Sequence, residues 1–157
     1  MTSLPLLEYV LLDTTTVGHL TKQGEHTHIY DGALEGRKAA ISFQVDAELL
    51  SSGYGPSRQM RLDLLRAGLL YLPHSRATNR WYARVSNVRK ALRRGRGGGR
   101  DAGDADMWII ATALEHGLAL VAHDRHQILL AVETGVRVFT NIRDLRYLNS
   151  LPVRSDS

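Results

Sequence analysis

Short apolar runs alternate with longer polar and amphipathic segments along most of this chain, and this alternation restricts the fold more than any other feature. Five runs are predicted to be strands, at about residues 8–13, 39–43, 69–72, 118–122 and 136–139. The segments between them are predicted to be helices, at about residues 14–20, 44–52, 56–66, 77–94, 106–116 and 125–133. Strands that alternate with helices form a parallel sheet with helices on both faces. The sequence therefore predicts a three-layer α/β/α fold with a parallel sheet of four or five strands.

The length of 157 residues and the hydrophobic content of 43% suit one globular domain. We expect residues 1–150 to form that domain and residues 151–157 to be a disordered tail. The glycine-rich segment at 95–100 is interpreted as a loop, because the two later strands need the earlier ones as partners. The absence of cysteine excludes disulfides, thiolate metal sites and thiol catalysis. Without an export signal or an apolar run near the ~18 residues of a membrane span, we expect a cytoplasmic protein with no membrane partner.

The net charge of +4 is unevenly distributed along the chain. Nine Lys or Arg residues and no acid lie between Arg76 and Arg100, and three Asp residues follow directly. A solvated helix face explains such a tract, but a tract of this kind also suits the phosphates of a nucleic acid backbone. The predicted backbone contacts are at the end of the tract, namely Arg93, Arg94, Arg96 and Arg100.

Four carboxylates occupy comparable positions in the predicted fold. Asp13 ends the first strand and Asp124 follows the fourth. Glu48 is placed in the first turn after the second strand, and Asp106 begins the helix before the fourth. Ligands of open parallel sheets bind beyond the carboxyl ends of the strands, where the strand order reverses. We therefore treat these four acids as a candidate site.

Each acid taken alone is more simply explained as a helix cap or as the partner of an arginine. If all four converge, their mutual repulsion requires either a divalent cation or protonation of some of them. Oxygen ligands without cysteine favour Mg²⁺ or Mn²⁺, ions that contact phosphate oxygens and activate water. The histidines beside Asp124, His123 and His126, are predicted to be surface residues, and ligation of a metal or binding of phosphate is the alternative.

Three motifs occur in a distinctive order. Residues 11–15 read Leu-Leu-Asp-Thr-Thr, and Ile41-Ser42 is followed by Glu48-Leu49 and Gly53. Residues 106–124 read DMWIIATALEHGLALVAHD. Together they resemble the PIN-domain ribonucleases, in particular the VapC-like toxins of prokaryotic toxin–antitoxin pairs, whose motifs are L-L-D-T-N, I-S…E-L…G and D-x-W-I-A-A-T-A-L…G-L-x-L-V-T-x-D. The resemblance extends from Tyr9 to about Arg146.

The resemblance implies a PIN-like fold and a set of roles. The acids Asp13, Glu48, Asp106 and Asp124 would hold one or two Mg²⁺ or Mn²⁺ ions. These ions would orient and deprotonate water for attack on an RNA phosphodiester, leaving a 5′-phosphate and a 3′-hydroxyl. Thr14 matches the hydroxyl residue that positions the first Asp. Asp104 is a candidate accessory ligand, and a loop cap is the alternative.

Three residues depart from the family motifs. Thr15 stands where Asn is common, Ile110 where Ala is common, and Ala122 where Thr is common. We expect these changes to affect the rate and the substrate more than the reaction. The resemblance also implies an RNA substrate, a cognate antitoxin protein that covers the acidic site, and a homodimer with contacts near residues 26–36 and 56–66.

Three other functions remain open. A PIN-domain nuclease that acts in RNA processing would have no antitoxin. A haloacid-dehalogenase-like phosphatase would use Asp13 as the nucleophile, but it needs a second Asp at position 15 and a suitably placed Lys. A silent RNA-binding module would not need the four acids, whose presence argues against it.

Overall fold

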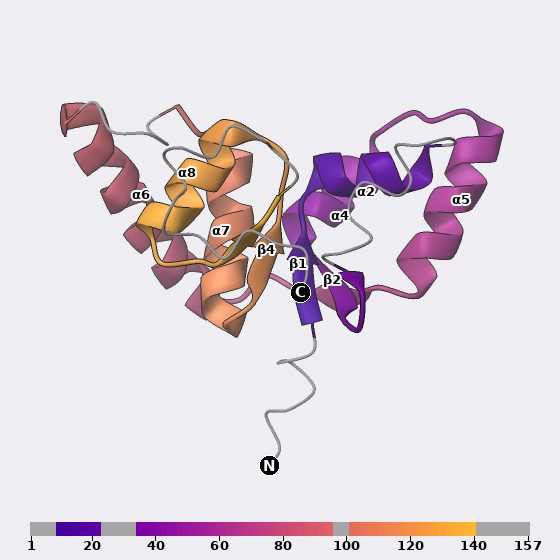
Figure 1. Ribbon diagram of the computed structural model, residues 1–157, viewed down its shortest axis with the longest axis horizontal. Coiled ribbons are helices and arrows are strands. Elements are labelled where there is room, and N and C mark those ends of the chain that lie inside the picture. Colours follow the sequence, from indigo (N-terminus) through magenta and orange to yellow (C-terminus); the bar gives the residue numbers. More distant parts are fainter. Residues whose placement is uncertain (1–8, 23–33, 96–100, 141–157) are drawn as a thin grey trace, which may run out of the picture.

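The structure is a computed structural model that describes residues 9–22, 34–95 and 101–140. In this part of the chain, five parallel strands form one sheet in the order β3-β2-β1-β4-β5 (Figure 1). The strands are β1 (Tyr9–Leu12), β2 (Lys38–Ser42), β3 (Leu70–Leu72), β4 (Ala119–Val121) and β5 (Val138–Phe139). The predicted α/β fold with a parallel sheet is confirmed, and the described strands number five.

The order of the strands reverses beside β1. The chain adds β2 and β3 on one side of β1 and then returns to place β4 and β5 on the other side. The pair Leu11↔Leu120 joins β1 to β4 across this reversal. Val10, Leu11 and Leu12 are almost completely buried, as expected for the central strand of a sheet covered on both faces.

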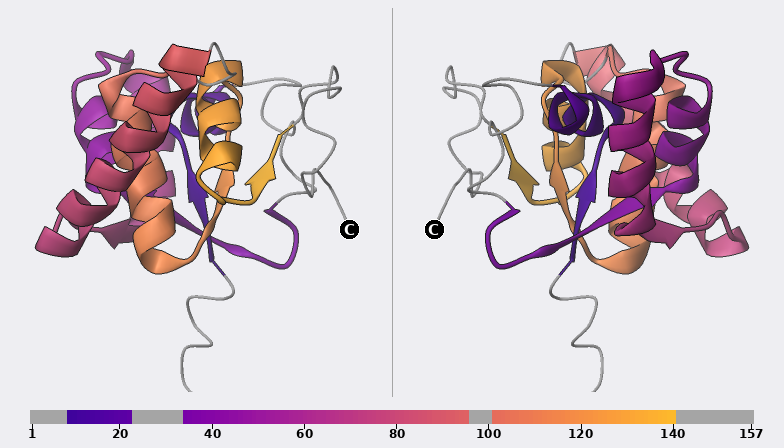
Figure 2. Two further views of the ribbon diagram at one scale, coloured as in Figure 1. Left: turned by 90° about the vertical axis from the view of Figure 1, so that its left-hand side faces the viewer. Right: turned by 90° about the vertical axis from the view of Figure 1, so that its right-hand side faces the viewer.

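Six helices are described. They are α2 (Thr14–Thr21), α4 (Phe43–Leu50), α5 (Pro56–Ala67), α6 (Arg76–Gly95), α7 (Asp104–His116) and α8 (Arg125–Glu133). In Figure 1, α6, α7 and α8 lie on one side of β1, and α2, α4 and α5 lie on the other. The long helix α6 packs along α7 (Figure 2). Among the described residues, none of the helices is both long and apolar enough to cross a membrane.

The hydrophobic core joins the sheet to α7 and α8. Leu12 of β1, Leu120 of β4, Ile110 of α7 and Ile128 of α8 are each 0% exposed. Burying an aliphatic side chain of this size completely contributes roughly 1.5–3 kcal/mol. These four residues belong to the core that packs the two central strands against α7, which carries Asp106, and α8, which Asp124 caps.

One predicted helix start is confirmed, and two predicted positions of site residues are wrong. The helix after the first strand begins at Thr14, as predicted, and Asp13 is its N-cap. The helix of Asp106 begins two residues early, at Asp104, which makes Asp106 its third residue. Glu48 lies in the second turn of α4 and not in the first, because the helix begins directly after β2. The predictions for residues 26–33, 96–100 and 151–157 lie outside the described residues.

Candidate active site

Asp13 lies at the carboxyl end of β1 and is 3% exposed. Its Oδ1 accepts the Thr16 N–H at 2.7 Å, which caps α2, and its Oδ2 accepts the His123 N–H at 3.4 Å. The pKa of this carboxyl is raised to about 6, chiefly by burial and to a smaller extent by the charge of Asp106, although these hydrogen bonds favour its ionised form. Asp13 is therefore a fixed carboxylate that is costly to ionise without a cation.

Glu48 is half-buried on α4, and its carboxylate accepts a hydrogen bond from the Thr14 hydroxyl. This bond joins the residue after Asp13 to a helix that follows the next strand. Thr14 was predicted to position Asp13, but its hydroxyl contacts Glu48, while Asp13 is oriented by the backbone of Thr16 and His123.

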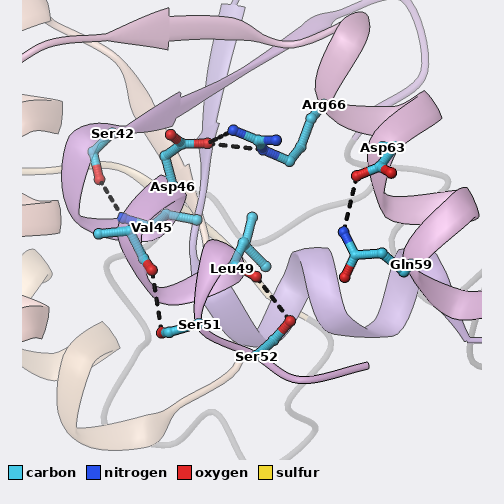
Figure 3. Close-up of polar contacts among 10 residues, drawn as sticks. Ser42, Val45, Asp46, Leu49, Ser51, Ser52, Gln59, Asp63 and Arg66 are labelled. Atoms are coloured by element: carbon cyan, nitrogen blue, oxygen red, sulfur yellow. Dashed lines mark hydrogen bonds and ion pairs between the residues drawn. The ribbon is translucent and has the colours of Figure 1, made fainter. Parts of the chain in front are cut away.

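The helix that carries Glu48 is held at both ends (Figure 3). Ser42 accepts the Val45 N–H at 3.2 Å at its start, and the hydroxyls of Ser51 and Ser52 donate to carbonyls of its last turns. The ion pair between Arg66 of α5 and Asp46 of α4, at 2.6 Å, ties α5 to the same helix. These contacts fix α4 independently of Glu48 itself.

Asp106 is the third residue of α7, and its Oδ2 accepts the Gly103 N–H at 3.1 Å. Partial burial raises the pKa of the Asp106 carboxyl, and the negative charges of Asp124 and Glu48 raise it further. His126 acts in the opposite direction and lowers it. Helix α7 thus presents a carboxylate to two other acids.

Asp124 is exposed and caps α8, where its Oδ1 accepts the Gln127 N–H at 3.0 Å. The capping explanation is therefore correct for Asp13 and Asp124. The arginine explanation is not supported, because none of the four acids forms an ion pair with Arg or Lys within residues 9–22, 34–95 and 101–140.

Asp106 interacts electrostatically with each of the other three predicted acids. Its charge raises the pKa of Asp13, and its own pKa is raised by the charges of Glu48 and Asp124. The four side chains come from the ends of β1 and β4 and from α4 and α7. The strand order reverses between β1 and β4, where an open parallel sheet binds its ligands.

The donor set fits a hydrated hard cation better than a closed metal cage. In the described part of the chain, no three carboxylate or imidazole groups are clustered closely enough to form a ready metal site. Magnesium usually keeps several of its waters and needs only one or two direct carboxylates. Mutually repelling carboxylates with oxygen donors only, and with no arginine partner among the described residues, suit an ion of this kind.

Asp104, the candidate accessory ligand, is directed toward α6. Its Oδ1 lies 3.6 Å from Arg89 Nη1 and accepts a long hydrogen bond of 3.4 Å from the Tyr82 hydroxyl. Of the predicted backbone contacts, Arg93 and Arg94 are exposed in the last turn of α6. Arg96 and Arg100 lie outside the described residues.

Two features of the site were not predicted. His126 is exposed as expected, but it is close enough to Asp106 to stabilise its charge, and its place two residues after Asp124 was the available signal. The second feature is the use of the His123 backbone N–H as a donor to Asp13. Every residue except proline carries a backbone N–H, so the residue types contain no signal for this contact.

The family model described as PIN domain matches residues 10–133. This chain belongs to the PIN domain family. PIN domains are nucleases that generally use a divalent metal, so the family is one of hydrolases that act on nucleic acids. Of the three departures from the family motifs, Thr15 is exposed, whereas Ile110 and Ala122 are buried. No curated protein matches the chain in sequence.

The solved structures that resemble this PIN domain share its fold at low sequence identity. VapBC2 from Rickettsia felis, bound to a DNA fragment from their promoter, is similar over 84% of this chain and 98% of that chain, with a TM-score of 0.64 and 17% identity. VapBC-1 from nontypeable Haemophilus influenzae is similar over 83% and 96%, with a TM-score of 0.64 and 20% identity. FitAcB from Neisseria gonorrhoeae is similar over 82% and 95%, with a TM-score of 0.58 and 19% identity.

Proposed function

We propose that this PIN domain is an endoribonuclease that depends on Mg²⁺ or Mn²⁺. Asp13, Glu48, Asp106 and Asp124 would hold the ion. The observation that supports this proposal is the electrostatic interaction of Asp106 with Asp13, Glu48 and Asp124 near the reversal of strand order, with no arginine partner among the described residues. Such a group of like charges favours binding of a divalent cation.

The chain's own groups prepare this site before an ion binds. Backbone N–H groups orient Asp13 and Asp106, and the Thr14 hydroxyl orients Glu48. The bound ion would supply activation of a water and polarisation of the phosphate. Cleavage in this manner would leave a 5′-phosphate and a 3′-hydroxyl.

RNA is the proposed substrate, and the exposed end of α6 is the proposed backbone contact. Arg93 and Arg94 lie there, and Arg96 and Arg100 follow in the sequence. Arginines of this kind neutralise phosphates, so binding should weaken with salt.

We also propose that the nuclease is a toxin held inactive by a cognate antitoxin protein. The fold similarity to the VapBC and FitAB toxin–antitoxin complexes supports an antitoxin partner.

A homodimer is proposed through α5, where Met60 and Leu64 are 65% and 71% exposed one turn apart. An RNA-processing nuclease would have the same site without an antitoxin. The phosphatase alternative is disfavoured, because Thr15 stands where a haloacid-dehalogenase-like enzyme needs a second Asp.

The test is cleavage of end-labelled single-stranded RNA with Mg²⁺, with EDTA, and with single-stranded DNA or a phosphomonoester in place of RNA. We expect cleavage of RNA that EDTA abolishes, and loss of at least about 100-fold in the variant Asp106→Asn. Asp63→Asn is the matched control, because Asp63 is an exposed acid bonded to Gln59 on α5. RNA cleavage by Asp106→Asn at the wild-type rate would refute the site. Co-expression with a small protein encoded directly upstream tests the antitoxin.

A further inference from the structure

One arginine of the basic tract is turned into the protein. Its neighbours on α6, Lys90, Arg93 and Arg94, are exposed, but the Arg89 side chain is only 13% exposed. A solvated helix face would leave this residue in water, and a phosphate contact would require an exposed guanidinium. Arg89 therefore needs a different explanation from the rest of the tract.

Arg89 contacts the segment that leads into α7. Its Nη1 donates to the Ala102 carbonyl at 2.9 Å and lies 3.6 Å from Asp104 Oδ1. Its Nε is buried and makes no hydrogen bond within the described residues, so these two contacts hold the guanidinium. The two partners flank Gly103 on both sides.

Gly103 links Arg89 to the acidic site. It is the N-cap of α7 but has no side chain to close the first turn, and its N–H instead donates to Asp106 Oδ2 at 3.1 Å. Its carbonyl accepts the Met107 N–H at 3.1 Å, the first bond of the helix. The position of the Gly103 peptide thus decides where the Asp106 carboxylate is held.

We infer that Arg89 is a positioning residue for the active site: it clamps Ala102 and Asp104, and so fixes the Gly103 amide that orients Asp106. Because the part that concerns the ion rests on the proposed function, the clamp is tested first without any metal. Arg89→Met keeps most of the aliphatic stem of the side chain and removes the guanidinium. Lys90→Met makes the same change of charge and length at the next residue, which is exposed.

The first measurement is amide exchange by NMR in the metal-free protein. In Arg89→Met we expect the Gly103 amide to exchange about tenfold faster, because a charge-assisted contact that holds its peptide is lost. The Leu120 amide, which donates to the Arg137 carbonyl at 2.9 Å in the sheet, is the internal reference and should not change. Lys90→Met should leave both amides unchanged, and Arg89→Lys should restore part of the Gly103 protection. Unchanged Gly103 exchange in Arg89→Met would overturn the inference.

The second measurement is the Kd for Mn²⁺ by calorimetry. Two possible roles of Arg89 predict opposite changes of this Kd in Arg89→Met. If Arg89 acted only as a positive charge, it would repel the Mn²⁺ ion. Its removal would then tighten Mn²⁺ binding. As a positioning residue, its removal should weaken Mn²⁺ binding about tenfold, the lower end of the cost of losing an outer-shell partner. Tighter binding in Arg89→Met overturns the inference. A wild-type chain that binds no Mn²⁺ contradicts the proposed function instead, and leaves the amide-exchange result to decide the role of Arg89.

Discussion

The Thr14 hydroxyl donates a hydrogen bond to the Glu48 carboxylate, and this contact joins two residues that are 34 positions apart in the sequence. The hydrogen bond connects the start of α2, just after β1, to α4, the helix that follows β2. The bond also reserves one Glu48 oxygen, leaving the other for a ligand.

Removal of this donor should impair the proposed nuclease without unfolding it. Thr14→Val keeps the shape of the side chain, and we expect it to lower RNA cleavage by about 10- to 100-fold, the usual cost of losing an outer-shell partner. Thr15→Val is the control, because Thr15 is the exposed neighbour. A Thr14→Val variant as active as Thr15→Val would show that the orientation of Glu48 is unimportant.

Neutralising Asp106 should stabilise the metal-free protein. Burial and the charges of Asp124 and Glu48 raise the pKa of the Asp106 carboxyl, so its ionised form opposes folding at neutral pH. Asp106→Asn should therefore raise the metal-free Tm by a few degrees. A fall in Tm, measured in EDTA by calorimetry, would indicate that Asp106 is a structural acid.

The stability of the metal-free protein should depend on pH through Asp13. Its pKa is raised from 3.8 to about 6, chiefly by burial, so the folded state binds the proton more tightly than the unfolded state. The cost of ionising Asp13 is absent below pH 4 and reaches about 3 kcal/mol above pH 6. The free energy of unfolding of wild type, relative to Asp13→Asn, should therefore fall between pH 4 and pH 7. Urea unfolding in EDTA at several pH values measures this difference, and a flat difference would contradict the raised pKa.

Removing the Glu115 carboxylate should destabilise the protein, whereas neutralising Asp106 should stabilise the metal-free protein. Its side chain is 12% exposed near the other end of α7, where it accepts the Ser75 hydroxyl at 2.8 Å and the Thr78 hydroxyl at 2.5 Å at the start of α6. Glu115→Ala should lower the free energy of unfolding by about 2 kcal/mol, since it removes the carboxylate that accepts both hydroxyls. The exposed Glu133→Ala is the control. Equal urea midpoints for the two variants would show that this network adds no stability.

The exposed apolar face of α5 should mediate the proposed dimer. Leu64 is 71% exposed, and Leu64→Glu would place a charge in the interface. We expect light scattering to give a dimer for wild type and a monomer for Leu64→Glu. Ala91→Glu, an exposed change on α6, should remain dimeric. A Leu64→Glu variant that is still a dimer would place the interface elsewhere.

The sequence by itself determined the order of the strands and helices, and it predicted the four acids of the candidate site. A buried parallel strand can be predicted from the sequence because it needs an apolar run such as Val10–Leu12. A helix can be predicted because its periodicity depends only on neighbouring residues. The tertiary structure decided which groups meet. His123 donates to Asp13 across 110 residues of chain, and Arg89 turns inward to hold the start of α7. The start of α7 at Asp104, like these contacts, depends on a partner supplied by a distant segment, and local sequence patterns contain no information about that partner.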